Sequence, residues 1–161
     1  MSILNGLIDE NVDRHTRDLV TLTATASITS ADHAGRTLLM GEVGGDAAAT
    51  FTLPAATGTG SVFNFVVSVV NTSNYLVKVA DATDTIDGQI MITDADGTAA
   101  TSFVTAAASD TITLNGTTTG GGAIGDYVEL IDIASNQYAV SGMVTCAAGS
   151  NIATMFSATV S

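Results

Sequence analysis

Short runs in which apolar and polar residues alternate fill most of the chain after residue 19. The runs are rich in Val, Ile, Thr and aromatic residues, and Gly, Pro, Asn or Asp residues separate them. Runs of this kind that recur about every 8 to 12 residues are typical of the strands of a β-sandwich or barrel. The predicted strands cover residues 20–25, 36–40, 49–53, 61–70, 75–79, 89–93, 102–105, 111–114, 127–133, 137–141 and 152–160.

The run 61–70 is the most apolar of these and is predicted to be the buried centre of the fold. A corner with Pro54, Gly58 and Gly60 joins it to the preceding strand. Proline cannot donate a hydrogen bond to a sheet, and glycine accepts positive φ, so the chain is expected to turn sharply here. No strand alternates with a helical segment. We therefore expect an all-β fold, an antiparallel sandwich or barrel of the jelly-roll or β-tulip-like type.

The first 18 residues follow a different pattern, in which apolar residues recur at spacings of three and four with charged residues between them. This is typical of a short amphipathic helix. Burying one aliphatic side chain is worth about 1.5 to 3 kcal/mol, so the segment is expected to dock on a partner, to pack on its own domain, or to fray. We divide the chain into an N-terminal arm (1–20) and one β domain (21–161). The apolar residues of the arm are Ile3, Leu4, Leu7, Ile8 and Val12.

Charge is scarce and strongly acidic. Sixteen acidic and four basic residues give a net charge of −12, which disfavours direct binding to nucleic acid or to an anionic membrane. Asp132 is the last charged residue. Because an exposed segment without charge is unfavourable, we expect other subunits to cover part of residues 133–161. The residues predicted for this subunit contact are Met143, Val144, Ile152, Met155 and Phe156.

Catalytic motifs are missing from the sequence. The two histidines, His15 and His33, lie in no motif that would pair them with a serine or with the single cysteine, Cys146. A lone cysteine excludes an intrachain disulfide, and we expect Cys146 to be a small buried apolar residue. We expect no enzyme activity and no cofactor. The N-terminus lacks the pattern of a signal peptide, and no apolar run is long enough for a membrane span.

Aspartates concentrate in two segments near glycines and are candidate cation ligands. An EF-hand that began at Asp94 would need glycine at its sixth position and glutamate at its twelfth, where Ala99 and Thr105 stand. Turns stabilised by Asx side chains explain these aspartates more simply. The run 120–122 lacks the residues of a phosphate-binding loop and predicts a flexible loop. The candidate aspartates are Asp81, Asp84, Asp87, Asp94 and Asp96.

Three segments together carry a resemblance to a known family. They are TLPAATGTGSVFNFVV at 52–67, YLVKV leading to DTIDG within 75–88, and GDYVEL with NQYAVSG within 125–142. Their order resembles small β-rich virion proteins of tailed bacteriophages, especially head decoration (cement) proteins, and also modules of tail fibres. Fibre modules often carry a tryptophan where Tyr138 stands, and this chain has no tryptophan.

The resemblance implies a homotrimer on the outer surface of the capsid. Terminal arms would reach onto the major capsid protein, and the trimer would bridge capsid subunits. The alternative is a receptor- or glycan-binding module of a tail fibre. That module would use loops 71–74 and 115–125, with Tyr75, Tyr127 or Tyr138 as platforms for sugars, unless these tyrosines are half-buried strand residues. For a third class, a polysaccharide-degrading enzyme, the sequence offers no convincing pair of carboxylates.

Overall fold

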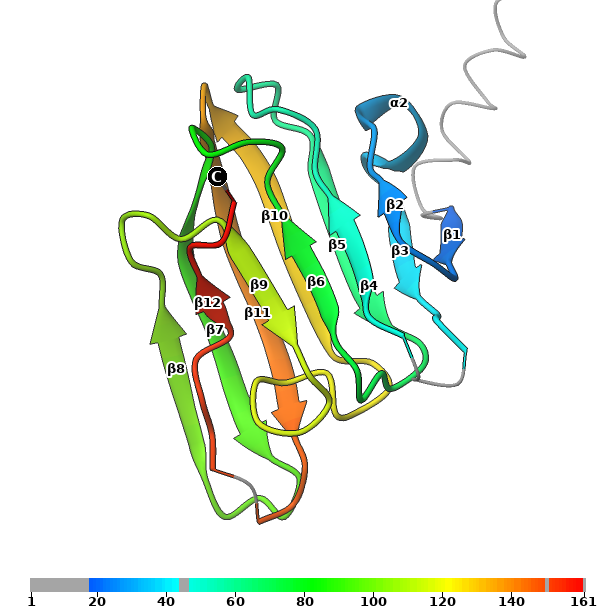
Figure 1. The fold of residues 1–161 in the computed structure, drawn as a ribbon, viewed down its shortest axis with the longest axis vertical. Helices are drawn as coiled ribbons and strands as arrows, with labels where there is room; N and C mark the ends of the chain where they lie inside the picture. The colour runs from blue at the N-terminus through cyan, green and yellow to red at the C-terminus, as the bar shows by residue number, and fades with distance from the viewer. Residues whose placement is uncertain (1–17, 44–46, 150, 161) are drawn as a thin grey trace, which may run out of the picture.

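Two β-sheets stack face to face in a computed structural model that describes residues 18–43, 47–149 and 151–160 (Figure 1). One sheet has seven strands and the other has five, and neither closes on itself within the described residues. The predicted all-β class and the sandwich architecture are confirmed.

Most strands follow the predicted positions, but two long strands and the last strand differ as described below, and the strand over 26–27 was not predicted. The seven-stranded sheet consists of β1 (Leu19–Leu22), β3 (Thr37–Met40), β5 (Val62–Val67), β7 (Thr85–Asp94), β8 (Ala100–Val104), β10 (Tyr127–Ala134) and β11 (Gln137–Cys146). The five-stranded sheet consists of β2 (Ala26–Ser27), β4 (Ala49–Thr52), β6 (Tyr75–Lys78), β9 (Thr111–Leu114) and β12 (Phe156–Ser157). A one-turn helix, α2 (Ser30–His33), lies between β2 and β3.

Both sheets are mixed, whereas the pattern had suggested antiparallel sheets. Their orders are β1-β3-β5-β10-β11-β7-β8 and β12-β9-β6-β4-β2, and five of the ten strand pairs are parallel. The first six strands alternate between the two sheets. Each strand therefore pairs with the strand two places earlier in the chain, and the two run in the same direction. Alternating polarity reveals a strand but not its direction, which is why the sequence pattern does not indicate the parallel pairs.

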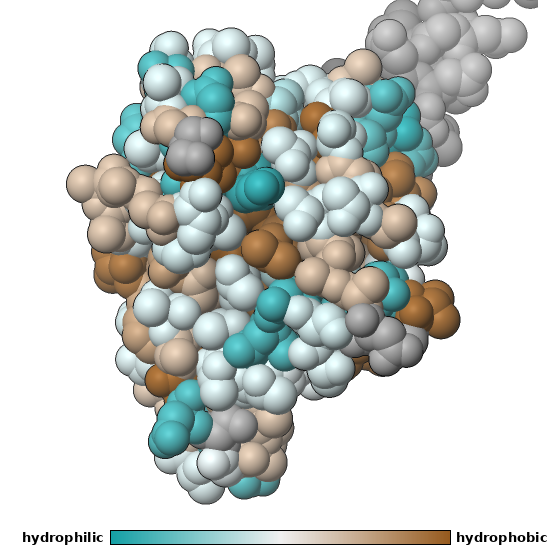
Figure 2. All heavy atoms as spheres, in the orientation of Figure 1, coloured by the Kyte–Doolittle hydropathy of each residue, from teal (hydrophilic) through white to brown (hydrophobic). Residues whose placement is uncertain are grey.

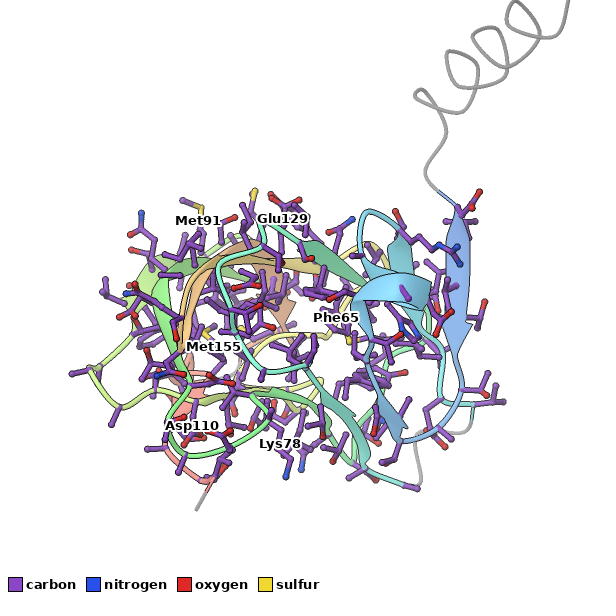
Figure 3. All side chains as sticks on the ribbon, turned by 90° about the horizontal axis from the view of Figure 1, so that it is seen from above. Phe65, Lys78, Met91, Asp110, Glu129 and Met155 are labelled. Atoms are coloured by element: carbon purple, nitrogen blue, oxygen red, sulfur yellow. The ribbon has the colours of Figure 1, made fainter. Side chains whose placement is uncertain are left out.

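The core lies between the two layers and centres on β5, as predicted. Phe63, Phe65 and Val67 point inward from this strand and are fully buried. The ring of Phe51 on β4 lies 5.8 Å from Phe65 and 5.9 Å from Tyr75, centroid to centroid. Figure 3 shows Phe65 between the layers, with Met91 and Glu129 on one outer side and Lys78 and Asp110 on the other.

Two glycines lie inside long strands and had been taken for strand ends. β7 begins at Thr85, within the segment expected to be a loop, and passes through Gly88. β11 continues beyond Ser141 through Gly142 to Cys146. A Cβ at Gly88 would overlap the carbonyl oxygen of Val140, and one at Gly142 would lie 2.5 Å from the carbonyl oxygen of Tyr127. Glycine is needed at both positions because a neighbouring strand lies too close for a side chain.

The two ends of the described chain also differ from expectation. Leu19 and Val20 already pair with β3, so the β domain begins inside the predicted arm, whose residues 1–17 lie outside the described residues. Near the other end, β12 is a two-residue strand where a strand over 152–160 was predicted. Between the predicted strands 20–25 and 36–40, α2 begins after Thr29, whose side chain caps it by accepting a 3.2 Å hydrogen bond from the Asp32 amide.

Candidate functional site

A buried carboxylate fixes the corner between β4 and β5. Asp132 is 3% exposed, and its Oδ1 accepts hydrogen bonds from the amides of Thr57 (3.0 Å) and Gly58 (2.7 Å). Its Oδ2 accepts from the Thr59 amide (3.0 Å) and hydroxyl (2.7 Å). Burial raises the pKa of Asp132, but the hydrogen bonds from Thr59, Gly58 and Thr57 outweigh it and hold the pKa below its ordinary value.

Two further side chains hold the same corner, one from β11 and one from the loop before β7. The Tyr138 hydroxyl on β11 donates a 2.8 Å hydrogen bond to the carbonyl of Pro54. The Ala56 amide donates to Oδ2 of Asp84 at 3.3 Å. Asp84 is 1% exposed, and burial, together with the charges of Asp81 and Asp132, raises its pKa.

The three segments on which the expected resemblance rests meet at this corner. Segment 52–67 contains the corner, segment 75–88 contributes Asp84, and segment 125–142 contributes Tyr138. Asp132 lies between the two motifs of the last segment and is not one of the residues that carry the resemblance. In the seven-stranded sheet, the strands from these segments, β5, β10, β11 and β7, are consecutive neighbours. The resembling segments thus form one packed block with a tightly held turn.

Asp110 and Asp126 are buried carboxylates that hold other loops. Asp110 accepts hydrogen bonds from the amides of Thr159 (2.8 Å) and Val160 (3.0 Å), and so holds the chain after β12. Asp126 accepts from the Thr145 amide at 2.8 Å. Burial raises the pKa of Asp126, and the hydrogen bonds that it accepts offset part of the rise.

The remaining candidate aspartates serve turns and neighbouring side chains. Asp81 accepts from the amide and hydroxyl of Thr83, which lower its pKa. Asp94 accepts from the Asp96 amide at 2.8 Å, as an Asx turn requires. Asp87 accepts from Nε2 of Gln137 at 2.9 Å. Within the described ranges, no three His, Cys, Asp or Glu side chains gather as a metal site would require.

The structure places Cys146 and His33 in different elements, β11 and α2. Cys146 is buried and unpaired, as expected, and burial together with the charge of Asp94 raises the pKa of its thiol. His33 is in α2, where its Nδ1 accepts a 3.0 Å hydrogen bond from the Thr29 amide. His15 lies outside the described residues.

Loop 115–125 is packed, although the glycines had predicted a flexible loop. Oδ1 of Asn115 accepts hydrogen bonds from the amides of Thr117 (2.9 Å), Thr118 (2.7 Å) and Thr119 (3.0 Å). The glycine at 120 lies so close to Val144 that a Cβ would overlap that side chain. A single amide side chain and close packing therefore fix this loop.

Two of the three tyrosines proposed as sugar platforms are unsuitable because they are fully buried. Tyr75 and Tyr138 have no exposed surface, and their rings pack among core phenylalanines. Burial raises the pKa of both hydroxyls. Tyr127 is 38% exposed and is the member of the set that can stack on a ligand.

The residues predicted for subunit contact divide between surface and core. Val144, Met155 and Phe156 are buried within their own chain, and Ile152 is partly buried against the same core. Their lack of charge is thus explained by packing inside the chain. Met143 is 51% exposed on the outer face of the seven-stranded sheet and remains available to a partner.

Met143 belongs to an apolar row that crosses this outer face. Neighbouring strands place Tyr127 opposite Met143, and Met143 opposite Met91, which is 47% exposed. In the other direction Tyr127 lies opposite Val66, which lies opposite Leu39. Two shallow hollows of about 270 and 280 Å³ flank Tyr127, Met143 and Met91. We call these five residues the apolar row. The sequence did not reveal it because only the register of β3, β5, β10, β11 and β7 brings its members together.

Comparisons with known proteins found no match: no family model, no curated protein and no solved structure matches the chain. Within the described residues, no helix has the length and apolar character that crossing a membrane would demand.

Proposed function

We propose that the chain is a structural protein of a tailed-bacteriophage virion. As a homotrimer it would decorate the outside of the capsid, bind the major capsid protein and bridge its subunits. The observation that supports the proposal is the meeting of the three resembling segments at one corner, where Asp84 and Tyr138 hold the turn.

The distribution of side chains on the sandwich also supports a binding role. The carboxylates of Asp132, Asp110 and Asp126 accept hydrogen bonds from backbone amides, which stabilises the scaffold. The apolar row, by contrast, faces outward and includes three side chains that are more than a third exposed. Exposed apolar surface of this kind is typical of sites where proteins bind one another.

The N-terminal arm is the proposed contact with the capsid. Its apolar residues lie in residues 1–17, outside the described residues, so this part of the proposal rests on their spacing in the sequence. Several arms on one oligomer would strengthen a modest contact through effective concentration. An oligomer would then bind a capsid far more tightly than a single chain.

The test is binding of the purified protein to phage heads that lack it, followed by electron cryomicroscopy of the decorated particles. The double variant Leu4→Asp with Leu7→Asp removes two apolar side chains from the arm. Ser2→Asp with Asn5→Asp adds the same charge at polar positions and is the matched control. At about 1.5 to 3 kcal/mol per buried aliphatic side chain, the first variant should weaken binding by about 100-fold or more.

The control variant should bind within a few-fold of the wild type. Equal binding of the two double variants would remove the arm from the contact. A wild-type protein that leaves no density on the outer surface of the heads would exclude the decoration role.

The tail-fibre alternative is retained through Tyr127, which is exposed beside a shallow hollow. We propose it as the second candidate, with a saccharide stacked on this ring. A glycan array probed with wild type and Tyr127→Ala would test it. Binding that depends on Tyr127 would support the alternative, and an array without a signal would exclude it.

A further inference from the structure

The two outer faces of the sandwich differ in chemistry. From the five-stranded sheet, Thr50, Thr52, Thr113 and Lys78 alternate with buried residues and point outward. Figure 2 views the molecule from this side, where residues of near-neutral hydropathy cover much of the surface. Leu76 also points outward here, and the threonines and Lys78 provide the polar side chains that are typical of a sheet surface in contact with water.

The opposite face, on the seven-stranded sheet, is apolar across its middle. Tyr127, Met143 and Met91 lie side by side on neighbouring strands there and are 38%, 51% and 47% exposed. In the described strands of this sheet, the outward positions hold two charged residues, Glu129 and Asp87. Both lie outside the apolar row, and Asp87 accepts hydrogen bonds from Gln137 and Thr85. The row is therefore an uncharged strip within a strongly acidic molecule.

We propose that this outer face is the surface through which one copy of the chain binds another. A net charge of −12 makes two copies repel one another. The repulsion is weakest where facing surfaces carry few carboxylates, and burial of methionine and tyrosine side chains supplies the attraction. A second copy is thus a better occupant than a basic partner, because the row offers no cluster of carboxylates for such a partner to bind.

The area of this outer face is large enough for a contact between two copies of the chain. Seven strands about 4.8 Å apart, with about seven residues each at about 3.3 Å, form a flat face on the order of 600 Å². Two such faces in contact bury about 1,200 Å², above the roughly 1,000 Å² expected of a biological interface. The methionines suit this contact because their unbranched side chains adapt to an irregular opposing surface.

This inference goes beyond the proposed function, because two copies that bind through the same face form a dimer, whereas a homotrimer needs contact between two different surfaces of each chain. The experiment is sedimentation velocity of the full chain in the absence of capsids, at about 1 to 100 μM. Met143→Asp and Met91→Asp place a charge in the row. Val43→Asp places the same charge on a residue that is 78% exposed in the loop after β3, away from this sheet face, and is the control.

Wild type and Val43→Asp should form the same oligomer, whereas the two row variants should associate at least about 100-fold more weakly. Circular dichroism establishes that each variant is folded. A wild type that is monomeric throughout, or folded row variants that associate like the wild type, would overturn the proposal. Self-association without capsid binding would remove the capsid role and leave this interface standing.

A second measurement uses the unmodified protein. Hydrogen peroxide should oxidise Met91 and Met143 more slowly, by several-fold, when the concentration is raised through the association range, and mass spectrometry reads this at each site. Rates that do not change at Met91 and Met143 while the protein associates would place the interface elsewhere and overturn the proposal.

Discussion

Oδ1 of Asp132 lies 2.7 Å from the backbone nitrogen of Gly58, although 74 residues separate them in sequence. The hydrogen bond joins the end of β10 to the corner between the two sheets. Neighbouring amides donate to the same carboxylate, so one side chain satisfies three backbone groups of a partly buried turn. The corner is therefore stabilised by a residue far from it in sequence.

Asp132→Ala should lower the free energy of unfolding by about 3 kcal/mol, because it leaves three amides of the corner without their acceptor. Urea denaturation measures the loss. Asp87→Ala is the control, since it removes a surface carboxylate bonded to side chains, and should change stability by less than about 1 kcal/mol. Equal effects of the two substitutions would contradict the proposed role of Asp132.

The pKa of Asp132 predicts a loss of stability in acid. Its pKa is lower in the folded protein than in the unfolded chain, where it is about 3.9. Its contribution is therefore fully present above about pH 4 and disappears as the pH falls through the lower, folded value. The unfolding free energy of the wild type should decline below about pH 4, and Asp132→Asn should show a shallower decline. A variant curve parallel to that of the wild type would rule out this linkage.

The contribution of Asp84 to stability should change with pH in the opposite direction. Burial raises its pKa, so the folded protein favours the protonated form, and the molecule gains stability as the pH falls through this raised folded pKa towards the unfolded value. Asp84→Asn is uncharged at every pH. Measured against the wild type by urea denaturation, this variant should therefore be relatively more stable at pH 7 than at pH 4. The reverse order would contradict the pKa direction.

Gly120→Ala should destabilise the protein more than Gly35→Ala. Both glycines have positive φ, +95° and +73°, so each substitution carries a similar backbone strain of about 1 kcal/mol. A Cβ at 120 would also lie 2.6 Å from Cβ of Val144, whereas one at 35 meets nothing within 4 Å. The extra overlap should cost about 1 to 3 kcal/mol more, read from thermal unfolding. Equal melting temperatures would mean that Val144 moves aside freely.

The sequence predicts strands well where apolar and polar side chains alternate. It predicts them less well where the close backbone of an adjacent strand requires a glycine. Phe63, Phe65 and Val67 alternate with outward residues, which is sufficient to identify β5 as central. Gly88 and Gly142 look like strand ends, because the reason for each glycine is the close approach of another strand. Local pattern carries no information about that approach.

The same limit applies to the candidate site. Asp84, Tyr127 and Met143 were named from the sequence, but for separate roles. Only the strand register unites Tyr127 and Met143 with Met91, and only the fold brings Asp132 to the corner. The absence of charge from residues 133–161 predicts that other subunits cover part of this segment. In the structure, most of its large apolar side chains pack into the core of their own chain. Absence of charge indicates burial without identifying what covers the residue.

The position of β10 has a consequence for synthesis of the protein. β5 pairs with β3 on one side and with β10 on the other, and four more strands are translated between β5 and β10. A nascent chain therefore carries its most apolar strand with one open edge until β10 has left the ribosome. Such an edge can pair with other chains, so chaperones have most to protect during this interval.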